Sequence, residues 1–192
     1  MSARDSQRQR VYDWEWSVST PQLSTRLTWD GVVDLVHLVW ENWRPNTRPP
    51  QVKNMGNRSS AARGCRAYVQ FPKWSWMPHT ILHECAHALN DGCQQFRYRK
   101  TDTCAAHGPE FVRIYCDLIK WFTNTNVVNS AREHGVKVAA SVSYAKPQKP
   151  RTPRMFAKIL QSVPQAKAQA EAASAGLHLT KKGKVDRRYK TV

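Results

Sequence analysis

Apolar side chains recur at helical spacing in three segments of the chain. Residues 29–43 place valines and tryptophans three, four and seven positions apart, until Arg44 and Pro45 interrupt the pattern. Residues 79–90 and 109–122 show the same kind of spacing, with Pro109 at the favourable first-turn position of the last segment. Such spacing places the apolar residues on one face of a helix. We therefore expect three amphipathic helices.

Two shorter segments alternate apolar and polar residues, which is the pattern of a half-buried strand. The first is residues 64–71, which Pro72 ends. The second is residues 14–18, ahead of Pro21, where a short strand or an ordered arm is expected. The inward-facing positions of the first segment would be Cys65, Ala67, Val69 and Phe71.

The composition changes near residue 141. A chain of 192 residues is long enough for one well-cored domain and an appendage. Residues 141–192 contain 12 Lys or Arg but only Glu171 and Asp186 as acidic residues, so they carry +10 of the total charge of +16. We expect one domain over residues 1–140, followed by a basic, partly disordered or helical tail over residues 141–192.

The cysteines and the N-terminal residues indicate a reducing compartment. The number of cysteines, five, is odd, and the opening MSARDSQRQR lacks the apolar stretch of a secretory signal. The longest apolar runs fall far short of the roughly 20 residues that cross a bilayer. We expect a cytoplasmic protein without a membrane span, and the sequence leaves its oligomeric state open. Three of the cysteines are expected to be small buried hydrophobes: Cys65, Cys85 and Cys116.

The helix expected over residues 79–90 carries the candidate chemistry. His83-Glu84-Cys85-Ala86-His87 is an H-E-x-x-H sequence, and four residues make about one helical turn, so both imidazoles reach toward one ion. Glu84 would lie beside the ion, where a carboxylate can take a proton from bound water. Catalytic zinc has three protein ligands and one open position. The motif therefore predicts a Zn²⁺ site that needs a third ligand.

Two residues compete for the position of the third ligand. His107 follows His87 by 20 residues, at a junction between a loop and a helix, and is preferred. Cys93 is the alternative, because a thiolate binds zinc well. Glu110 would orient a ligand or, more in keeping with its place in a first helical turn, cap the helix or face solvent. Ordinary structural roles are expected for the other histidines considered, which are His37, His79 and His134.

The segment His107-Gly108-Pro109-Glu110-Phe111, following an H-E-x-x-H helix, resembles the SprT-like family of zinc metallopeptidases, which includes the Spartan-type proteases. This resemblance covers about residues 29–122. The opening residues 4–12 also resemble a subgroup of small metallohydrolases from actinobacteria and their phages. Many relatives carry a cysteine-based zinc ribbon after the protease domain, but no cysteine follows Cys116 and no Cys-x-x-Cys occurs here.

The resemblance implies an α+β, zincin-like metallopeptidase domain with a basic C-terminal tail. It also implies that His83, His87 and His107 bind zinc, that Glu84 is the catalytic residue, and that the substrate is a protein or peptide associated with DNA. The cytoplasm would be that of the host if a phage encodes the chain. The alternative is a nucleic-acid-binding or phage accessory protein without protease activity, in which zinc serves only to hold the fold together.

The basic tail leads to a first prediction, on DNA binding. Deleting residues 141–192 should weaken binding to DNA of arbitrary sequence and remove most of its salt dependence, because the lost cations would neutralise several phosphates. Affinities of the full chain and of residues 1–140, measured at several salt concentrations, test this. Equal salt dependence of DNA binding in the two proteins would indicate that the tail only improves solubility. The residues expected to contact phosphates are Lys181, Lys182, Lys184, Arg187, Arg188 and Lys190.

Overall fold

Helices form most of the secondary structure in the computed structural model, which describes residues 5–18, 20–90 and 105–142. Within these ranges the fold is mixed α+β, with six α-helices and a small three-stranded sheet. The expected tail, except for its first two residues, lies outside the described residues, as do Cys93 and Cys104. The elements are, in order, α1 (Arg8–Ser17), α2 (Pro21–Ser24), α3 (Trp29–Trp43), β1 (Gln51–Gly56), β2 (Arg63–Gly64), β3 (Tyr68–Pro72), the 3₁₀ helix η1 (Lys73–Ser75), α4 (Pro78–Leu89), α5 (Pro109–Thr123) and α6 (Val128–Glu133).

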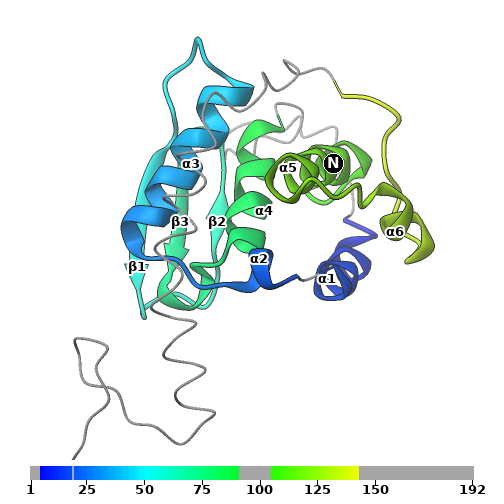
Figure 1. The fold of residues 1–192 in the computed structure, drawn as a ribbon, viewed down its shortest axis with the longest axis horizontal. Coiled ribbons are helices and arrows are strands. Elements are labelled where there is room, and N and C mark those ends of the chain that lie inside the picture. Colours follow the sequence, from blue (N-terminus) through cyan, green and yellow to red (C-terminus); the bar gives the residue numbers. More distant parts are fainter. Residues whose placement is uncertain (1–4, 19, 91–104, 143–192) are drawn as a thin grey trace, which may run out of the picture.

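The three helices predicted from apolar spacing are confirmed as α3, α4 and α5. Side-chain and backbone caps fix their ends: the Thr28 hydroxyl accepts a hydrogen bond from the Gly31 N–H at the start of α3, and Asn124 adopts a left-handed conformation after α5. Proline occupies the first turn of both α4 and α5. Figure 1 shows α4 between α3 and α5, so its apolar residues are buried against both neighbours.

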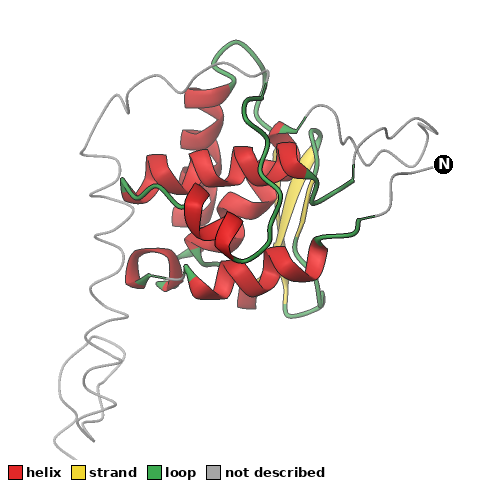
Figure 2. Cartoon of the chain, turned by 90° about the vertical axis from the view of Figure 1, so that its right-hand side faces the viewer, coloured by secondary structure: helices red, strands yellow, loops and turns green. Residues whose placement is uncertain are grey.

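The sheet has the strand order β1-β3-β2, with β1 parallel and β2 antiparallel to β3. It lies at one flank of a mainly helical body (Figure 2). The prediction of a single strand over residues 64–71 is wrong. A turn divides this segment, and in it the Cys65 N–H donates a hydrogen bond to the Tyr68 carbonyl at 2.9 Å. Val69 and Phe71 are fully buried as expected, whereas Cys65 is half-buried and Ala67 is exposed. Side chains alternate between the two faces of a sheet only where the chain is extended, so the turn removes Cys65 and Ala67 from the expected inward face.

The strand or arm expected near the N-terminus is instead the helix α1. The period of two suggested that Trp14, Trp16 and Val18 share a face, but Trp14 is fully buried and Trp16 is 75% exposed. The buried positions are Val11 and Trp14, with half-buried Val18 next, at the spacing of a helix. A second side of α1, with Tyr12 and Glu15, contacts histidines of α4 and not solvent. Because α1 contacts the protein on two sides, its sequence lacks the single apolar stripe by which a surface helix is predicted.

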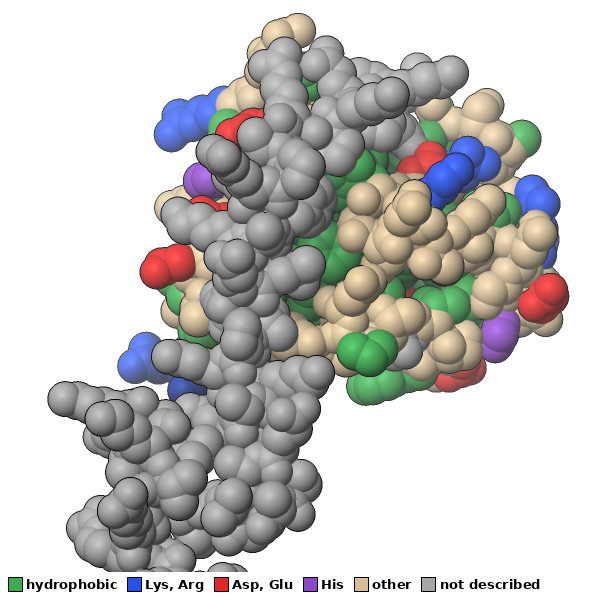
Figure 3. Space-filling view, viewed as in Figure 1, with side chains coloured by type: hydrophobic (Ala, Val, Ile, Leu, Met, Phe, Trp, Pro, Cys, Tyr) green, Lys and Arg blue, Asp and Glu red, His purple; other side chains and the backbone are tan. Residues whose placement is uncertain are grey.

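Charge on the described surface is mixed. Residues 1–140 carry only +6 of the net charge of +16. On the face seen in Figure 3, Lys and Arg side chains alternate with Asp and Glu side chains. Cys85 and Cys116 are buried, as expected. None of the described helices has the length and apolar character needed to cross a membrane.

Candidate metal centre

Three histidines from two parts of the chain converge at one point. His83 and His87 project from adjacent turns of α4. His107 lies in the turn before α5, in which the Gly108 N–H donates to the Ala105 carbonyl at 2.9 Å. Their candidate ligand atoms all lie within 4.8 Å of one another. His83 and His107 are buried and His87 is half-buried. The cluster can therefore hold a metal ion.

The spacing of the imidazole nitrogens fits a single small ion. The Nε2 atom of His83 lies 3.2 Å from Nε2 of His87 and 3.3 Å from Nε2 of His107. Nitrogen ligands in a tetrahedral shell, at about 2.0–2.1 Å from zinc, are about 3.3–3.4 Å apart. Two of the three distances between these nitrogens therefore match those in a tetrahedral zinc shell. Three protein ligands leave the fourth tetrahedral position for water or substrate.

Carboxylates fix the orientation of two of the imidazoles. Oε1 of Glu15, on α1, lies 2.5 Å from Nδ1 of His83, and Oδ2 of Asp5 lies 2.6 Å from Nδ1 of His107. When Nδ1–H donates to a carboxylate, Nε2 is the unprotonated nitrogen and is free to bind a metal. Such carboxylate–histidine pairs also raise the basicity of the ligand. The N-terminal segment therefore supplies the outer part of the metal centre.

A buried glutamine holds the N-terminal segment against the loop that carries His107. Nε2 of Gln7 donates to the His107 carbonyl at 2.6 Å, and Oε1 of Gln7 accepts from the Lys137 N–H at 2.8 Å. Gln7 is only 4% exposed, so these bonds satisfy polar atoms that water does not reach. One side chain thereby links the start of α1, the third histidine and the segment after α6.

Aromatic rings enclose the histidines. The ring of Phe111 stacks on His87 with centroids 4.3 Å apart, and Tyr12 covers His83 at 5.8 Å. Tyr115, buried beneath, donates its hydroxyl to the His79 carbonyl at 3.3 Å. The metal centre is therefore a polar cluster within a largely apolar shell, which strengthens its electrostatic interactions.

The environment keeps two of the histidines neutral. Burial lowers the pKa of His87 well below its ordinary value, and the neighbouring His83 and His107 lower it further. Burial and His83 also lower the pKa of His107, although Asp5 opposes this. Burial works against protonation of His83 as well, but the charge and hydrogen bond of Glu15 outweigh it and raise the pKa. Neutral imidazole is the form that binds metals.

Glu84 lies beside the cluster and is only 7% exposed. Burial raises its pKa to about 7, although His83 and a hydrogen bond from the backbone of Gly64 act in the opposite direction. A carboxylate with a pKa near neutrality can both accept and donate a proton. The approach of β2 to α4 depends on glycine, because a Cβ at Gly64 would lie 2.0 Å from the Glu84 carbonyl oxygen.

A cleft of about 290 Å³ opens onto His83 and Glu84. Its walls come from α1, from the loop between β1 and β2, and from the start of α4. Trp16 and Trp74 line it and are the exposed large hydrophobic side chains of the described chain, at 75% and 49%. The Trp74 indole N–H is held by the Ser59 carbonyl at 3.2 Å. Exposed aromatic rings at a cleft are typical of ligand contact.

Comparison of the chain with family models, with characterised proteins and with solved structures returned no match. The interpretation of the site therefore rests on its own residues and their geometry.

The structure brings His83, Glu84, His87 and His107 together, and among the described residues Glu110, His79 and His134 make other contacts. Glu110 is exposed, and Asp5 makes the contact to His107 for which Glu110 was considered. His79 bonds the Leu23 carbonyl through Nδ1 at 3.0 Å, and His134 bonds the Ser130 carbonyl at 2.8 Å, so both have local structural roles. Cys93, the alternative third ligand, lies outside the described residues.

Sequence reasoning missed Asp5, Gln7 and Glu15. The resemblance drew attention to residues 4–12, but no role was assigned to any of them. A helical interpretation of residues 8–17 would have placed Glu15 one turn from Tyr12, on one side of α1. Their partners are 68 to 130 positions away along the chain, and no local pattern indicates such pairs.

The ligand set can be tested by metal analysis. Replacing His107 by alanine should lower the bound metal from about one ion per chain to near zero after dialysis, because two imidazoles hold zinc poorly. Emission spectroscopy on purified protein measures the content. His134→Ala, at an exposed histidine, is the matched control and should retain the ion. Unchanged metal in His107→Ala together with loss in Cys93→Ala would replace this ligand set by the thiolate scheme.

The carboxylate on α1 gives a separate prediction. Glu15→Gln should weaken metal affinity about 10- to 100-fold while the fold persists, because the His83 ring loses its charged partner. Competition with a chromophoric chelator measures the affinity. Asp13→Asn, at an exposed carboxylate of the same helix, should leave affinity unchanged. Equal affinities in the two variants would show that Glu15 does not support the metal centre.

Proposed function

We propose that the chain is a zinc-dependent hydrolase of peptide bonds with a zincin-like fold. The observation that carries this proposal is the convergence of three imidazoles beside a buried carboxylate, next to a cleft that His83 and Glu84 line. Imidazole ligands suit zinc, and three of them with an open fourth position are the donor set of catalytic zinc. When bound there, zinc supplies an activated water and polarises the substrate carbonyl.

The residues of the chain divide the remaining work. Glu84 takes the proton from the attacking water and then passes it to the leaving amine nitrogen. Glu15 and Asp5 keep the Nδ1 atoms of His83 and His107 protonated, so that their Nε2 atoms stay directed at the ion. Trp16 and Trp74 contact the substrate at the rim of the cleft.

A purely structural zinc site is the alternative, in a nucleic-acid-binding or phage accessory protein. Structural zinc has four protein ligands and no open position. The described residues offer three histidines, and two of the residues at the cluster, His83 and Glu84, also line the cleft. A carboxylate buried next to the ligands without binding the ion adds nothing to a structural site. These features favour the hydrolase.

Proteins associated with DNA are the proposed substrates. The support is the resemblance of the two histidine motifs to SprT-like peptidases, together with the +10 charge of residues 141–192. Those residues would hold the enzyme on DNA through phosphate contacts, where protein substrates are concentrated.

Replacing Glu84 by glutamine separates catalysis from metal binding. Glu84→Gln should lower the rate of peptide hydrolysis by at least about 100-fold, because the water loses its proton acceptor, while zinc content and thermal unfolding stay unchanged. Cleavage of a denatured protein, with and without DNA, gives the rate. Glu110→Gln, at an exposed glutamate, should keep full activity. Full activity in Glu84→Gln would overturn the mechanism, and absence of cleavage in the unaltered chain across substrates would favour the structural alternative.

A further inference from the structure

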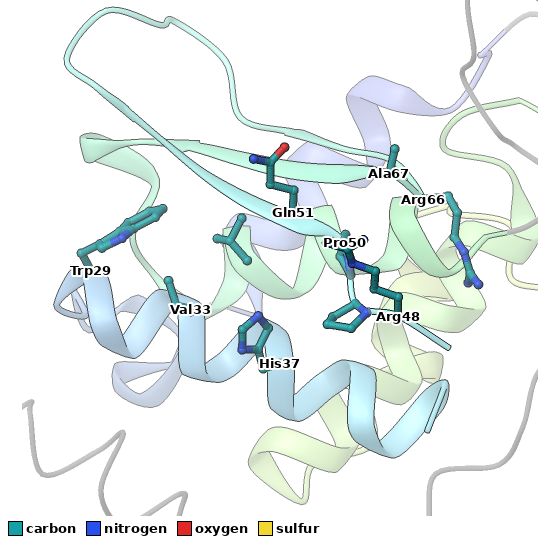
Figure 4. A pocket seen from close by; sticks show the side chains of 10 residues that line it. Trp29, Val33, His37, Arg48, Pro50, Gln51, Arg66 and Ala67 are labelled. Atoms are coloured by element: carbon teal, nitrogen blue, oxygen red, sulfur yellow. The ribbon is translucent and has the colours of Figure 1, made fainter. Parts of the chain in front are cut away.

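A second and larger cavity, of about 770 Å³, lies between α3 and β1 (Figure 4). No residue of the metal centre lines it. One wall is a row along α3, with Trp29, Val33 and His37 spaced four residues apart, and the opposite wall includes Val52 of β1. Its volume falls within the roughly 300–1,000 Å³ that is usual for small-molecule sites.

The lining of this cavity has positive charge without compensation. Arg48 and Arg66 both line it, and none of the lining residues is acidic. Within the described residues, no ion pair includes either guanidinium. Two cations and no carboxylate in one cavity raise the local concentration of anions. The chemistry of the lining therefore selects a negatively charged ligand.

Arg66 points most directly to a missing acceptor. Its Nη1 atom is buried and has no hydrogen-bond partner among the described residues. The guanidinium is fixed over the ring of Trp40, with Cζ 4.9 Å from the centroid. A buried donor without an acceptor is costly, and a water, an ion or a ligand can supply the acceptor. Phosphate oxygens fit a guanidinium through two parallel hydrogen bonds.

The other end of the cavity offers an aromatic surface. Figure 4 shows Trp29 at one end and the two arginines toward the other, with Val33 and His37 between. The Trp29 ring is supported from behind by Trp76, with centroids 5.4 Å apart. A planar base can stack on such a ring, and aromatic stacking with nearby cations is the usual way to bind nucleotides of any sequence.

We propose that this cavity binds a nucleoside phosphate, with the phosphate on Arg48 and Arg66 and the base against Trp29. The ligand is either a free nucleotide or one unit of a single strand. This site is independent of the hydrolase assignment, because it shares no residue with the metal centre.

The test uses the full chain and the double variant Arg48→Gln/Arg66→Gln, with Arg63→Gln as a control at an exposed arginine outside the cavity. Binding of an oligothymidylate is measured by fluorescence anisotropy at several salt concentrations. The double variant should bind about tenfold more weakly and reduce the slope of log Kd against log salt by about 0.7, the contribution of one neutralised phosphate in a single strand. The tail is present in every protein, so its contribution cancels.

Three further probes identify the source of the ligand and the role of the ring. If thymidine monophosphate binds the full chain and the double variant loses this binding, the ligand is a free nucleotide. If the double variant loses only binding of the oligonucleotide, the ligand is a strand. An abasic oligonucleotide should bind the full chain more weakly, because nothing stacks on Trp29. The single variant Arg48→Gln is measured in the same way. Arg48 is exposed, so weaker binding in this variant does not come from a folding defect at Arg66. An unchanged affinity and slope in the double variant, or equal binding of the abasic strand, would overturn the proposal.

Discussion

Two carboxylate–imidazole contacts tie the N-terminal segment to the rest of the domain. Glu15 to His83 and Asp5 to His107 join residues that are 68 and 102 positions apart. Removing one partner leaves the other without its hydrogen bond in a largely buried site, which is destabilising. The docking of α1 and the convergence of the histidines therefore depend on each other. The metal centre is assembled by tertiary packing and not by α4 alone.

Helix α4 meets two opposing demands. It is buried on almost every side, with Leu82, Cys85 and Leu89 in the apolar core, yet it also carries three of the four residues at the site. Burial disfavours charge there, which explains the lowered pKa of His87 and the raised pKa of Glu84. The same burial makes the site chemically useful, since neutral imidazoles bind metal and a glutamate with a pKa near 7 can transfer protons.

The two cavities differ in the ligand that each can accept. The cleft at the metal centre is small, has exposed tryptophans at its rim and has Glu84 within it, which suits a substrate that is cleaved. The cavity between α3 and β1 is larger and is lined by two arginines and no acidic residue, which suits the anion proposed above.

Local spacing in the sequence was sufficient for α3, α4 and α5, and for the placement of His83, Glu84 and His87 on one helix, because these features depend on residues within a turn or two of one another. The nearness of His107 came from its motif and from resemblance. Only the tertiary structure decided that residues 8–17 form a helix, that residues 64–71 divide between two strands, and that Asp5 and Glu15 face the histidines. The unpaired Nη1 of Arg66 belongs to the same group. Each of these features depends on contacts between distant parts of the chain, and the spacing of apolar residues along the sequence does not indicate such contacts.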